Sequence, residues 1–395
     1  MSVISDTYLK LHAKWSLQRT VAELLSKRWM EPAVPFIMML GVIVFCAVAI
    51  PNYLTLDNLT DTSSQFAEFG FVVLAMTVVL VVGGIDLSVG AVLALTTMVI
   101  GGVSEWTLAN GMPPVLAGCL AAGAGIATGA ACGVTVGSAV IGHLGRVVAV
   151  AVGVLCAVVL LPAHIGQPLA VLAGVAVAAA LWVANRVSLG KLELSPFIVT
   201  LGMMGVFRGL AKGVLEQTTI SPPHTWVNAL MQFGDSGPTR CLPWGTWLFI
   251  LLAVVVALTL RYTAFGRHVF AIGSNEETAR LCGVNVPRTK LTIYVIAIAL
   301  AGVAGIMQFS YINMGSATEG MGFELAVIAA VVIGGASLAG GEGSVLGTIV
   351  GALLMRVVIT GCSKMEWPSF MQEVVTGAII VAAVALDRLR HRRPE

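Results

Sequence analysis

Residues 83–90 read GGIDLSVG, and this stretch interrupts a long apolar tract. A single carboxylate, Asp86, stands there among glycines, with apolar runs on both sides. A charged side chain at the centre of a bilayer costs about 2.5–3.5 kcal/mol on insertion scales, so the surrounding structure must hold it. The stretch therefore predicts a break between two membrane helices, with Asp86 at the turn.

The composition places this break in a membrane protein. The chain is 57% hydrophobic and 11% charged, and its mean hydropathy is +0.94, which a water-exposed globular surface would not tolerate. Apolar runs of about 20 residues recur along it, each long enough to cross the hydrocarbon core. They are continuous rather than alternating, which argues against a transmembrane barrel. We expect an all-α polytopic protein with about 10–12 transmembrane helices.

The distribution of basic residues along the chain indicates how these helices are oriented in the membrane. Basic residues precede the first run and follow the last, so both termini are predicted to be cytoplasmic, the positive side of the membrane. The chain then divides into a cytoplasmic segment (1–32), a transmembrane domain (33–387) and a basic tail (388–395). Within the domain, 214–243 is expected outside, with a short surface helix at 226–233, and 261–290 inside. The predicted spans are 33–50, 66–83, 87–103, 115–137, 145–161, 169–187, 196–213, 244–260, 291–309, 324–339, 345–361 and 369–386.

The inner segment 261–290 contains a predicted short helix from Asn275 to Cys282. Ser274 or Asn275 would cap it, two acids fall in the first turn where the helix dipole favours them, and Gly283 would end it. Such a helix is too short to be stable alone in water. It either docks into a soluble partner or is an ordinary surface helix between two spans.

Few ionisable residues fall within the apolar runs. For Asp86 we consider three roles: a helix cap that accepts the N–H of Ser88 or Val89, a pathway lining, and a proton relay. Glu324 is interpreted as a snorkelling or capping acid rather than a substrate ligand, and Arg208 as an interfacial anchor. The spacing GG-x-x-L-x-x-G occurs at residues 83–90 and again at 334–341, an internal echo of the kind that transporters with paired broken helices show.

Several other function classes are disfavoured. The sequence has no GxSxG or HExxH motif, no paired carboxylates on one helix face and no redox cysteine pair, so we predict no enzyme activity. Its seven cysteines lack metal-ligand spacing, so no metal is expected. A GxxxxGK[ST] phosphate loop is also missing, and the basic residues follow membrane topology rather than a nucleic-acid footprint. Energy for transport would come from an ion gradient or from another subunit.

Three blocks of sequence resemble the permease subunits of bacterial ABC importers for monosaccharides, the group with ribose, xylose, arabinose, fructose and inositol permeases. They are VVGGIDLSVGAVLAL (81–95), SPFIVTLGMMGVFRGL (195–210), and the tract from TAFGRHVFAIGSNEETARLCGVNVPRTKL (263–291) to IAAVVIGGASLAGGEGSVLGTIVGALL (328–354). With the connecting spans they cover most of residues 50–390. The combination is specific to the family, although no single block is.

The resemblance implies an ABC importer permease in the bacterial inner membrane. It implies a homodimer enclosing one pathway, a cytoplasmic ATPase that binds ATP and Mg²⁺, and a periplasmic sugar-binding protein facing 214–243 and 310–322. The coupling helix to the ATPase would comprise Ser274, Asn275, Glu276, Glu277, Ala279, Arg280, Leu281 and Gly283. Motif and pathway candidates are Gly83, Gly84, Asp86, Ser88, Gly90, Pro196, Thr200, Glu324, Gly334, Gly335, Gly340 and Gly341.

The chain departs from the family pattern in two places. An Asn-Gly pair usually precedes the PFIVTLG block, whereas here Asn185 is followed by Arg186. Residues 118–187 also hold enough extra apolar sequence for about two more spans, and the tract at 125–134 resembles a family helix that lines the pathway. The alternatives are an ion-coupled secondary transporter acting alone and a channel or structural membrane protein. The transported sugar does not follow from the sequence.

Overall fold

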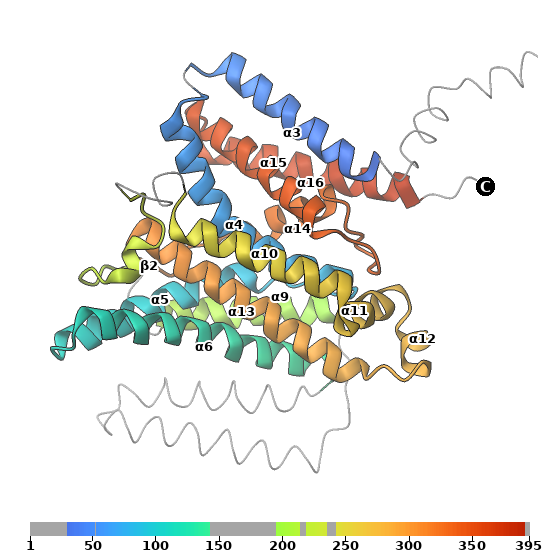
Figure 1. Ribbon diagram of the computed structural model, residues 1–395, viewed down its shortest axis with the longest axis horizontal. Helices are drawn as coiled ribbons and strands as arrows, with labels where there is room; N and C mark the ends of the chain where they lie inside the picture. Colours follow the sequence, from blue (N-terminus) through green and yellow to red (C-terminus); the bar gives the residue numbers. More distant parts are fainter. Residues whose placement is uncertain (1–29, 52, 143–194, 214–218, 235–241, 392–395) are drawn as a thin grey trace, which may run out of the picture.

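The computed structural model describes residues 30–51, 53–142, 195–213, 219–234 and 242–391, which form a bundle of long helices (Figure 1). The predicted all-α polytopic class is confirmed. Six of the described helices are long and apolar enough to cross a membrane. These six are α4 (Leu56–Val81), α5 (Val89–Ala109), α6 (Pro114–Val140), α10 (Trp244–Tyr262), α13 (Val286–Ile312) and α15 (Val345–Lys364).

The remaining elements are shorter or lie at the edges of the bundle. They are α3 (Met30–Ala49), α9 (Pro196–Gly213), α11 (Ala264–Ser274), α12 (Glu276–Leu281), α14 (Phe323–Ile333), α16 (Ser369–His391), the 3-10 turn η1 (Trp226–Ala229), and the strands β1 (Thr219–Ile220) and β2 (Gly315–Ser316). The predicted spans at 145–161 and 169–187, the Asn185–Arg186 turn, residues 1–29 and residues 392–395 lie outside the described residues.

Helix α13 runs through the middle of the bundle and packs against α4, α5 and α6. Its contact with α6 is close because one face of α6 carries a glycine at every fourth position: Gly125, Gly129, Gly133 and Gly137. A Cβ at Gly129 would lie 2.9 Å from both Gly302 Cα and the Ile298 carbonyl oxygen. Small residues let membrane helices approach closely. The tract 125–134 therefore serves helix packing in this structure.

The bundle has two distinct ends, which we call the β1–β2 end and the α12 end after the elements found there (Figure 1). At the first, β1 and β2 pair antiparallel with Thr219 opposite Ser316. The helix predicted at 226–233 is only the four-residue η1, and it is partly inserted, since Val227 and Asn228 are buried. Thr225 and Asn228 cap each other reciprocally and hold this turn.

The span predicted at 324–339 is wrong. Helix α14 has 11 residues, or about 16 Å at 1.5 Å per residue, roughly half of the hydrocarbon thickness. It ends where Gly334 and Gly335 interrupt it. The preceding segment, within the range 310–322, was expected to face an outside partner. Four of the ten residues 313–322 are buried, namely Gly315, Ser316, Ala317 and Gly320, whereas Met314, Thr318, Met321 and Gly322 are exposed. The segment is therefore partly inserted into the bundle, and its contact with an outside partner stays a prediction.

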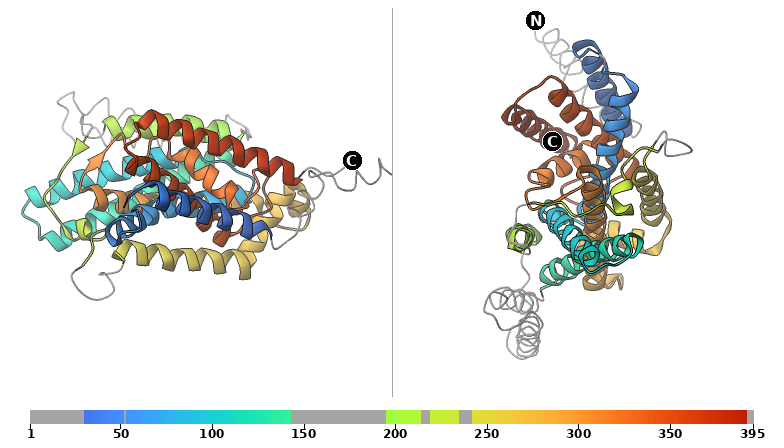
Figure 2. Two further views of the ribbon diagram at one scale, coloured as in Figure 1. Left: turned by 90° about the horizontal axis from the view of Figure 1, so that it is seen from above. Right: turned by 90° about the vertical axis from the view of Figure 1, so that its left-hand side faces the viewer.

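Figure 2 shows the helices from above and from one end, with α3, α15 and α16 on one side of the bundle and α6 and α9 on the other. The core between these layers is apolar and centred on α4 and α13, where Phe69, Phe71, Tyr294 and Phe309 are fully buried. Such burial of large side chains fixes the helices that carry the polar groups described below.

Candidate functional site: two helix breaks and the junctions they build

The first break, at GGIDLSVG, follows α4. Gly83 has a positive φ of 82°, and the N–H groups of Gly83 and Gly84 donate to the carbonyls of Leu80 and Val79 at 2.9 Å. This is a Schellman ending, in which a left-handed residue satisfies the last carbonyls of a helix. A side chain at Gly83 would be strained, because L-residues rarely adopt this φ. The chain then runs without helical structure to Val89, where α5 begins.

Asp86 is fully buried in this break. Its Oδ1 accepts hydrogen bonds from the Ser88 N–H at 2.8 Å and from the Ser88 hydroxyl at 2.6 Å. The predicted hydrogen bond to the Ser88 N–H is therefore present. The N-cap position itself belongs to Ser88 rather than to Asp86, and the Ser88 side chain makes no capping bond. The carboxylate thus fixes the entrance to α5 from one turn earlier.

The second break follows α14 and has the same geometry. Gly335 has a φ of 93°, and the N–H groups of Gly335 and Ala336 donate to the carbonyls of Val332 and Val331. Gly335, at the second position of its GG pair, therefore corresponds to Gly83, at the first position of the other. The repeat in the sequence aligns Gly83 with Gly334, whereas the structure superimposes the role of Gly83 on Gly335, one residue later.

The two breaks pack directly on each other. The Gly341 N–H donates to the Val81 carbonyl at 2.8 Å, and a Cβ at Gly340 would lie 2.8 Å from Gly83 Cα. Gly273, on α11, closes the contact, since its Cβ would lie 2.5 Å from the Gly341 nitrogen and nearer still to the Val81 oxygen. Segments far apart in sequence thus meet backbone to backbone at the α12 end.

Helix α12 lies directly beyond this three-way contact. Its cap is Asn275, whose Oδ1 accepts from the Thr278 N–H at 2.8 Å. Gly283, with a φ of 84°, ends it in another Schellman motif. The helix is shorter than predicted at each end, and Leu281 is 83% exposed while Ala279 is buried. Its docking role stays a prediction.

An ion pair ties α12 to the central helix. Glu276 Oε2 accepts from Lys290 Nζ, on α13, at 2.6 Å, and Glu276 Oε1 lies 3.3 Å from Arg280 Nη2. Ser274, the last residue of α11, lies against Gly341. A displacement of α12 would therefore reach α13 through Lys290 and both breaks through Gly273 and Ser274.

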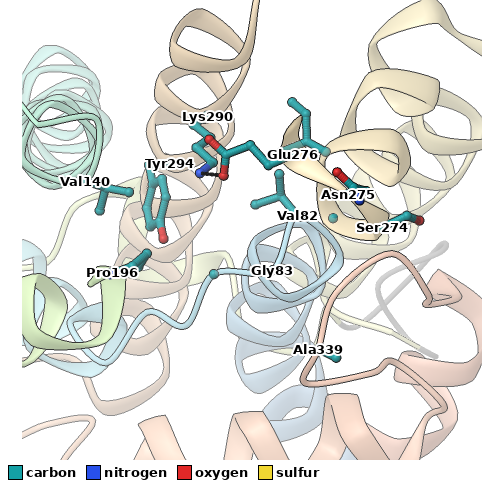
Figure 3. Close-up of a pocket in the computed structure, with 13 residues that line it drawn as sticks. Val82, Gly83, Val140, Pro196, Ser274, Asn275, Glu276, Lys290, Tyr294 and Ala339 are labelled. Carbon is teal, nitrogen blue, oxygen red and sulfur yellow. Dashed lines mark hydrogen bonds and ion pairs between the residues drawn. The ribbon is translucent and has the colours of Figure 1, made fainter. Parts of the chain in front are cut away.

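A cavity of about 240 Å³ lies among these elements (Figure 3). Figure 3 shows the Glu276–Lys290 pair at one side of it, with Tyr294 below and Gly83 and Ala339 opposite. The Tyr294 hydroxyl is buried and has no hydrogen-bond partner among the described residues. The full lining comprises Val82, Gly83, Gly84, Val140, Pro196, Ile272, Gly273, Ser274, Asn275, Glu276, Lys290, Tyr294 and Ala339.

The second junction lies in the middle of the bundle, where α5 and α14 begin. The segment 313–322 runs beside α5, from Thr97, whose Oγ1 accepts from the Ser316 N–H at 3.2 Å, to Gly90, which contacts Gly320. From there α14 continues to the α12 end, while α5 runs back to the β1–β2 end. Two helix N-termini therefore meet at mid-depth, and each carries a partial positive charge.

Charged groups gather at this junction. Glu324, in the first turn of α14, is buried, and its Oε1 lies 3.9 Å from Arg208 Nη2. Arg208 Nη1 also donates to the carbonyls of Ala317 and Glu319. Arg208 thus clamps the inserted segment, and its role as an interfacial anchor stays a prediction. Glu324 was predicted as a snorkelling or capping acid; it is buried and ion-paired at the start of α14, so it does not snorkel. On α9, Thr200 donates to the Ile85 carbonyl at 3.1 Å.

The structure therefore sorts the predicted site residues into two groups. Gly83, Gly84, Gly340, Gly341 and the α12 residues meet at the α12 end, and Asp86, Ser88, Gly90, Thr200 and Glu324 lie at or beside the mid-bundle junction. Pro196 and Gly334 lie at the edges of the first group. Sequence reasoning missed Gly273, Lys290 and the clamp made by Arg208, all of which act through tertiary contacts.

Comparison with known proteins agrees with this architecture. The sequence profile of the family described as branched-chain amino acid transport system / permease component matches residues 134–384. The chain is similar to the ribose import permease protein RbsC of Escherichia coli (strain K12), at 28% identity over 92% of this chain and 95% of the relative. RbsC of Bacillus subtilis (strain 168) is 30% identical, over 91% and 93%. The fructose import permease protein FrcC of Rhizobium meliloti is 31% identical, over 90% and 85%. No solved structure matches.

Proposed function

The chain belongs to the branched-chain amino acid transport system / permease component family, among its sugar ABC importer permeases, and on this premise we propose that it is the transmembrane subunit of an ATP-driven monosaccharide importer. The cargo would be a pentose, hexose or polyol, carried across the bacterial inner membrane by alternating access. A sugar is favoured over an amino acid because the relatives that cover nearly the whole chain are named for ribose and fructose.

Helix α12 is the feature that carries this proposal. It is capped at both ends, presents Leu281 to solvent, and directly follows α11, whose Gly273 and Ser274 touch the contact between the two helix breaks. Its mixed polar and apolar face suits a groove on a soluble ATPase, which would bind ATP and Mg²⁺ because this chain has no phosphate loop. The permease itself would catalyse no reaction.

Charge supports a cytoplasmic position for the α12 end. Arg261, Arg267, Arg280, Arg288 and Lys290 all lie there, and basic loops face the cytoplasm. The last helix, α16, also ends toward this side in Figure 1. The β1–β2 end would then face the periplasm and receive the sugar-binding protein, and two copies of the chain would enclose one pathway.

The contacts suggest how ATP binding moves the spans. Closing of the ATPase would displace α12, and Gly273 and Ser274 would transfer the displacement to both helix breaks by backbone contact. Because α5 and α14 start at mid-depth, a shift of the breaks would change the gap between them. Each ligand shifts the outward and inward states only by its difference in affinity for them.

A secondary transporter driven by an ion gradient is the alternative, and the buried acids Asp86 and Glu324 are the observation in its favour. The distinguishing experiment uses proteoliposomes. With the ATPase and the binding protein present, we expect ATP-dependent uptake of labelled ribose or fructose and no uptake of L-leucine. Vesicles holding this chain alone, under a proton or sodium gradient, should take up nothing. Gradient-driven uptake there would refute the proposal.

A further inference from the structure

A second cavity, of about 460 Å³, lies at the β1–β2 end, between the α3–α4 turn and the last turn of α15. It is separate from the cavity under α12, which lies at the other end of the bundle. Ile50, Pro51 and the Tyr53 ring give it an apolar side. Thr55, Asn58, Asp61 and Lys364 give it a polar one. Its volume falls in the range of small-molecule sites.

One polar group in this cavity lacks a partner. Asn58 is only 5% exposed, and its side-chain nitrogen donates to the Tyr53 carbonyl at 2.7 Å. Its Oδ1 is buried without a hydrogen bond to any described residue. A buried acceptor left unpaired costs about 1–3 kcal/mol, and native structures keep few of them. Because this oxygen is closed to solvent, Asn58 supports the wall from behind, through its hydrogen bond to the Tyr53 carbonyl, and the atoms open to a ligand belong to its neighbours.

The Asp61 carboxylate, one turn after Asn58 on α4, is held in a fixed orientation by side chains of the core. Asp61 accepts from the Tyr311 hydroxyl at 2.9 Å and from Gln65 Nε2 at 3.0 Å. Gln65 Oε1 in turn accepts from Arg356 Nη2 at 3.0 Å, and Arg356, on α15, is only 7% exposed. This network holds the Asp61 carboxylate in one orientation. It leaves the remaining lone pairs of the Asp61 carboxylate available to the cavity.

From this geometry we propose that the outer cavity binds a polyhydroxylated small molecule, the monosaccharide itself, as it arrives from the periplasmic side. The assignment rests on the proposed function. Sugar hydroxyls both donate and accept, and the wall offers an acceptor at Asp61, a hydroxyl at Thr55 and a donor at Lys364. The C–H face of a sugar ring matches the apolar side. Neither a simple anion nor a simple cation suits a wall that carries both signs of charge.

Two substitutions test the site without removing a known contact of the fold. Lys364→Met deletes the ammonium group and keeps the length of the side chain. Thr55→Trp fills the cavity, and Thr55 makes no capping hydrogen bond that would be lost. The matched control is Lys212→Met, because Lys212 likewise lies in the last turn of a helix that ends at this side, α9.

The measurement is saturation-transfer difference NMR on the chain in lipid nanodiscs, without the binding protein, using ribose, fructose and L-leucine as probes. We expect sugar signals with the wild type and with Lys212→Met, and none with L-leucine. Lys364→Met should weaken sugar binding about tenfold, the loss of one charge-assisted hydrogen bond, and Thr55→Trp should abolish it.

Two results would overturn the assignment: no sugar signal from the wild type, or equal signals from the wild type and Thr55→Trp. The ATP-dependent uptake of the same preparations separates this inference from the proposed function. If the importer carries sugar but Thr55→Trp leaves the NMR signal unchanged, only the outer site is wrong. If the wild-type importer carries no sugar, the proposed function is wrong as well.

Discussion

Replacing Gly273 with alanine places one methyl group in the contact between α11 and both helix breaks. The new Cβ would collide with the Val81 carbonyl oxygen and would lie 2.5 Å from the Gly341 nitrogen, so both backbone segments must retreat to reach the ordinary contact distance of 3.4 Å. The hydrogen bond from the Gly341 N–H to the same oxygen is 2.8 Å long and would break. All the obstructing atoms belong to the backbone, so no side-chain rotation relieves the clash.

The expected effect of Gly273→Ala follows from these two losses. Overpacking costs about 1–3 kcal/mol and a lost hydrogen bond about 1 kcal/mol, so we expect destabilisation of about 2–4 kcal/mol. Thermal unfolding of the purified chain measures it. In proteoliposomes with the partner ATPase and binding protein, the sugar carried per ATP hydrolysed should fall several-fold, because the α12 junction no longer closes.

Gly377→Ala is the control for this substitution. Gly377 lies in α16, where a Cβ would meet no described atom within 4 Å. A helical glycine replaced by alanine there should be neutral or slightly stabilising. If Gly273→Ala matches Gly377→Ala in melting temperature and in sugar carried per ATP, the backbone contact does not transmit the motion and the reasoning fails.

Three further substitutions test other contacts. Lys290→Met removes one of the two partners of Glu276 and leaves Arg280. Because the pair is partly exposed, the unfolding free energy should change by less than about 1 kcal/mol, yet the sugar carried per ATP should fall; an unchanged ratio would count against coupling through α13. Arg208→Met leaves Glu324 buried without its ion pair and should destabilise the chain by about 3 kcal/mol in thermal unfolding, whereas a melting temperature like the wild type's would show that the clamp is dispensable. Asp86→Asn keeps the Oδ1 acceptor for Ser88 and should preserve stability within about 1 kcal/mol together with ATP-driven uptake; loss of uptake in a stable variant would indicate a proton relay.

The sequence predicted those parts of the fold whose signals are local. Apolar run lengths located the long helices, and α12 followed from its cap, its first-turn acids and its terminating glycine. Helix α11 was missed, although Gly266, Val269 and Ile272 are buried at the three-residue spacing of a helix face. Because polar and apolar residues are mixed in α11, its average hydropathy is low, and a low average over a short segment is also typical of a loop.

The break in α14 shows how two local signals conflicted. Gly334 and Gly335 were recognised as an echo of the first motif, yet the apolar run continued past them and the predicted span was extended accordingly. The same pair could have shortened the helix, because a left-handed glycine ends it. The insertion of residues 313–322 beside α5 had no local signal, since it depends on close contacts with Thr97 and Gly90.

Most of the missed site residues act across long stretches of chain. Arg208 reaches Glu324 and the carbonyls of a segment more than a hundred residues later, and the Gly273 contact joins three separate segments. Hydropathy and motif spacing do not report such pairings. Lys290 and Glu276, in contrast, are close in sequence, and their opposite charges on either side of Gly283 were a usable signal.

The central claim is that the ATPase acts on this chain at α12. Photo-crosslinking in the assembled importer tests it directly. The crosslinking amino acid p-benzoylphenylalanine replaces Glu277 in α12 and, as a control, Glu366, which follows α15 at the β1–β2 end. We predict a covalent adduct with the ATPase from position 277 and none from position 366. An importer that carries sugar with ATP but gives no adduct at 277, or gives one at 366, would contradict the account.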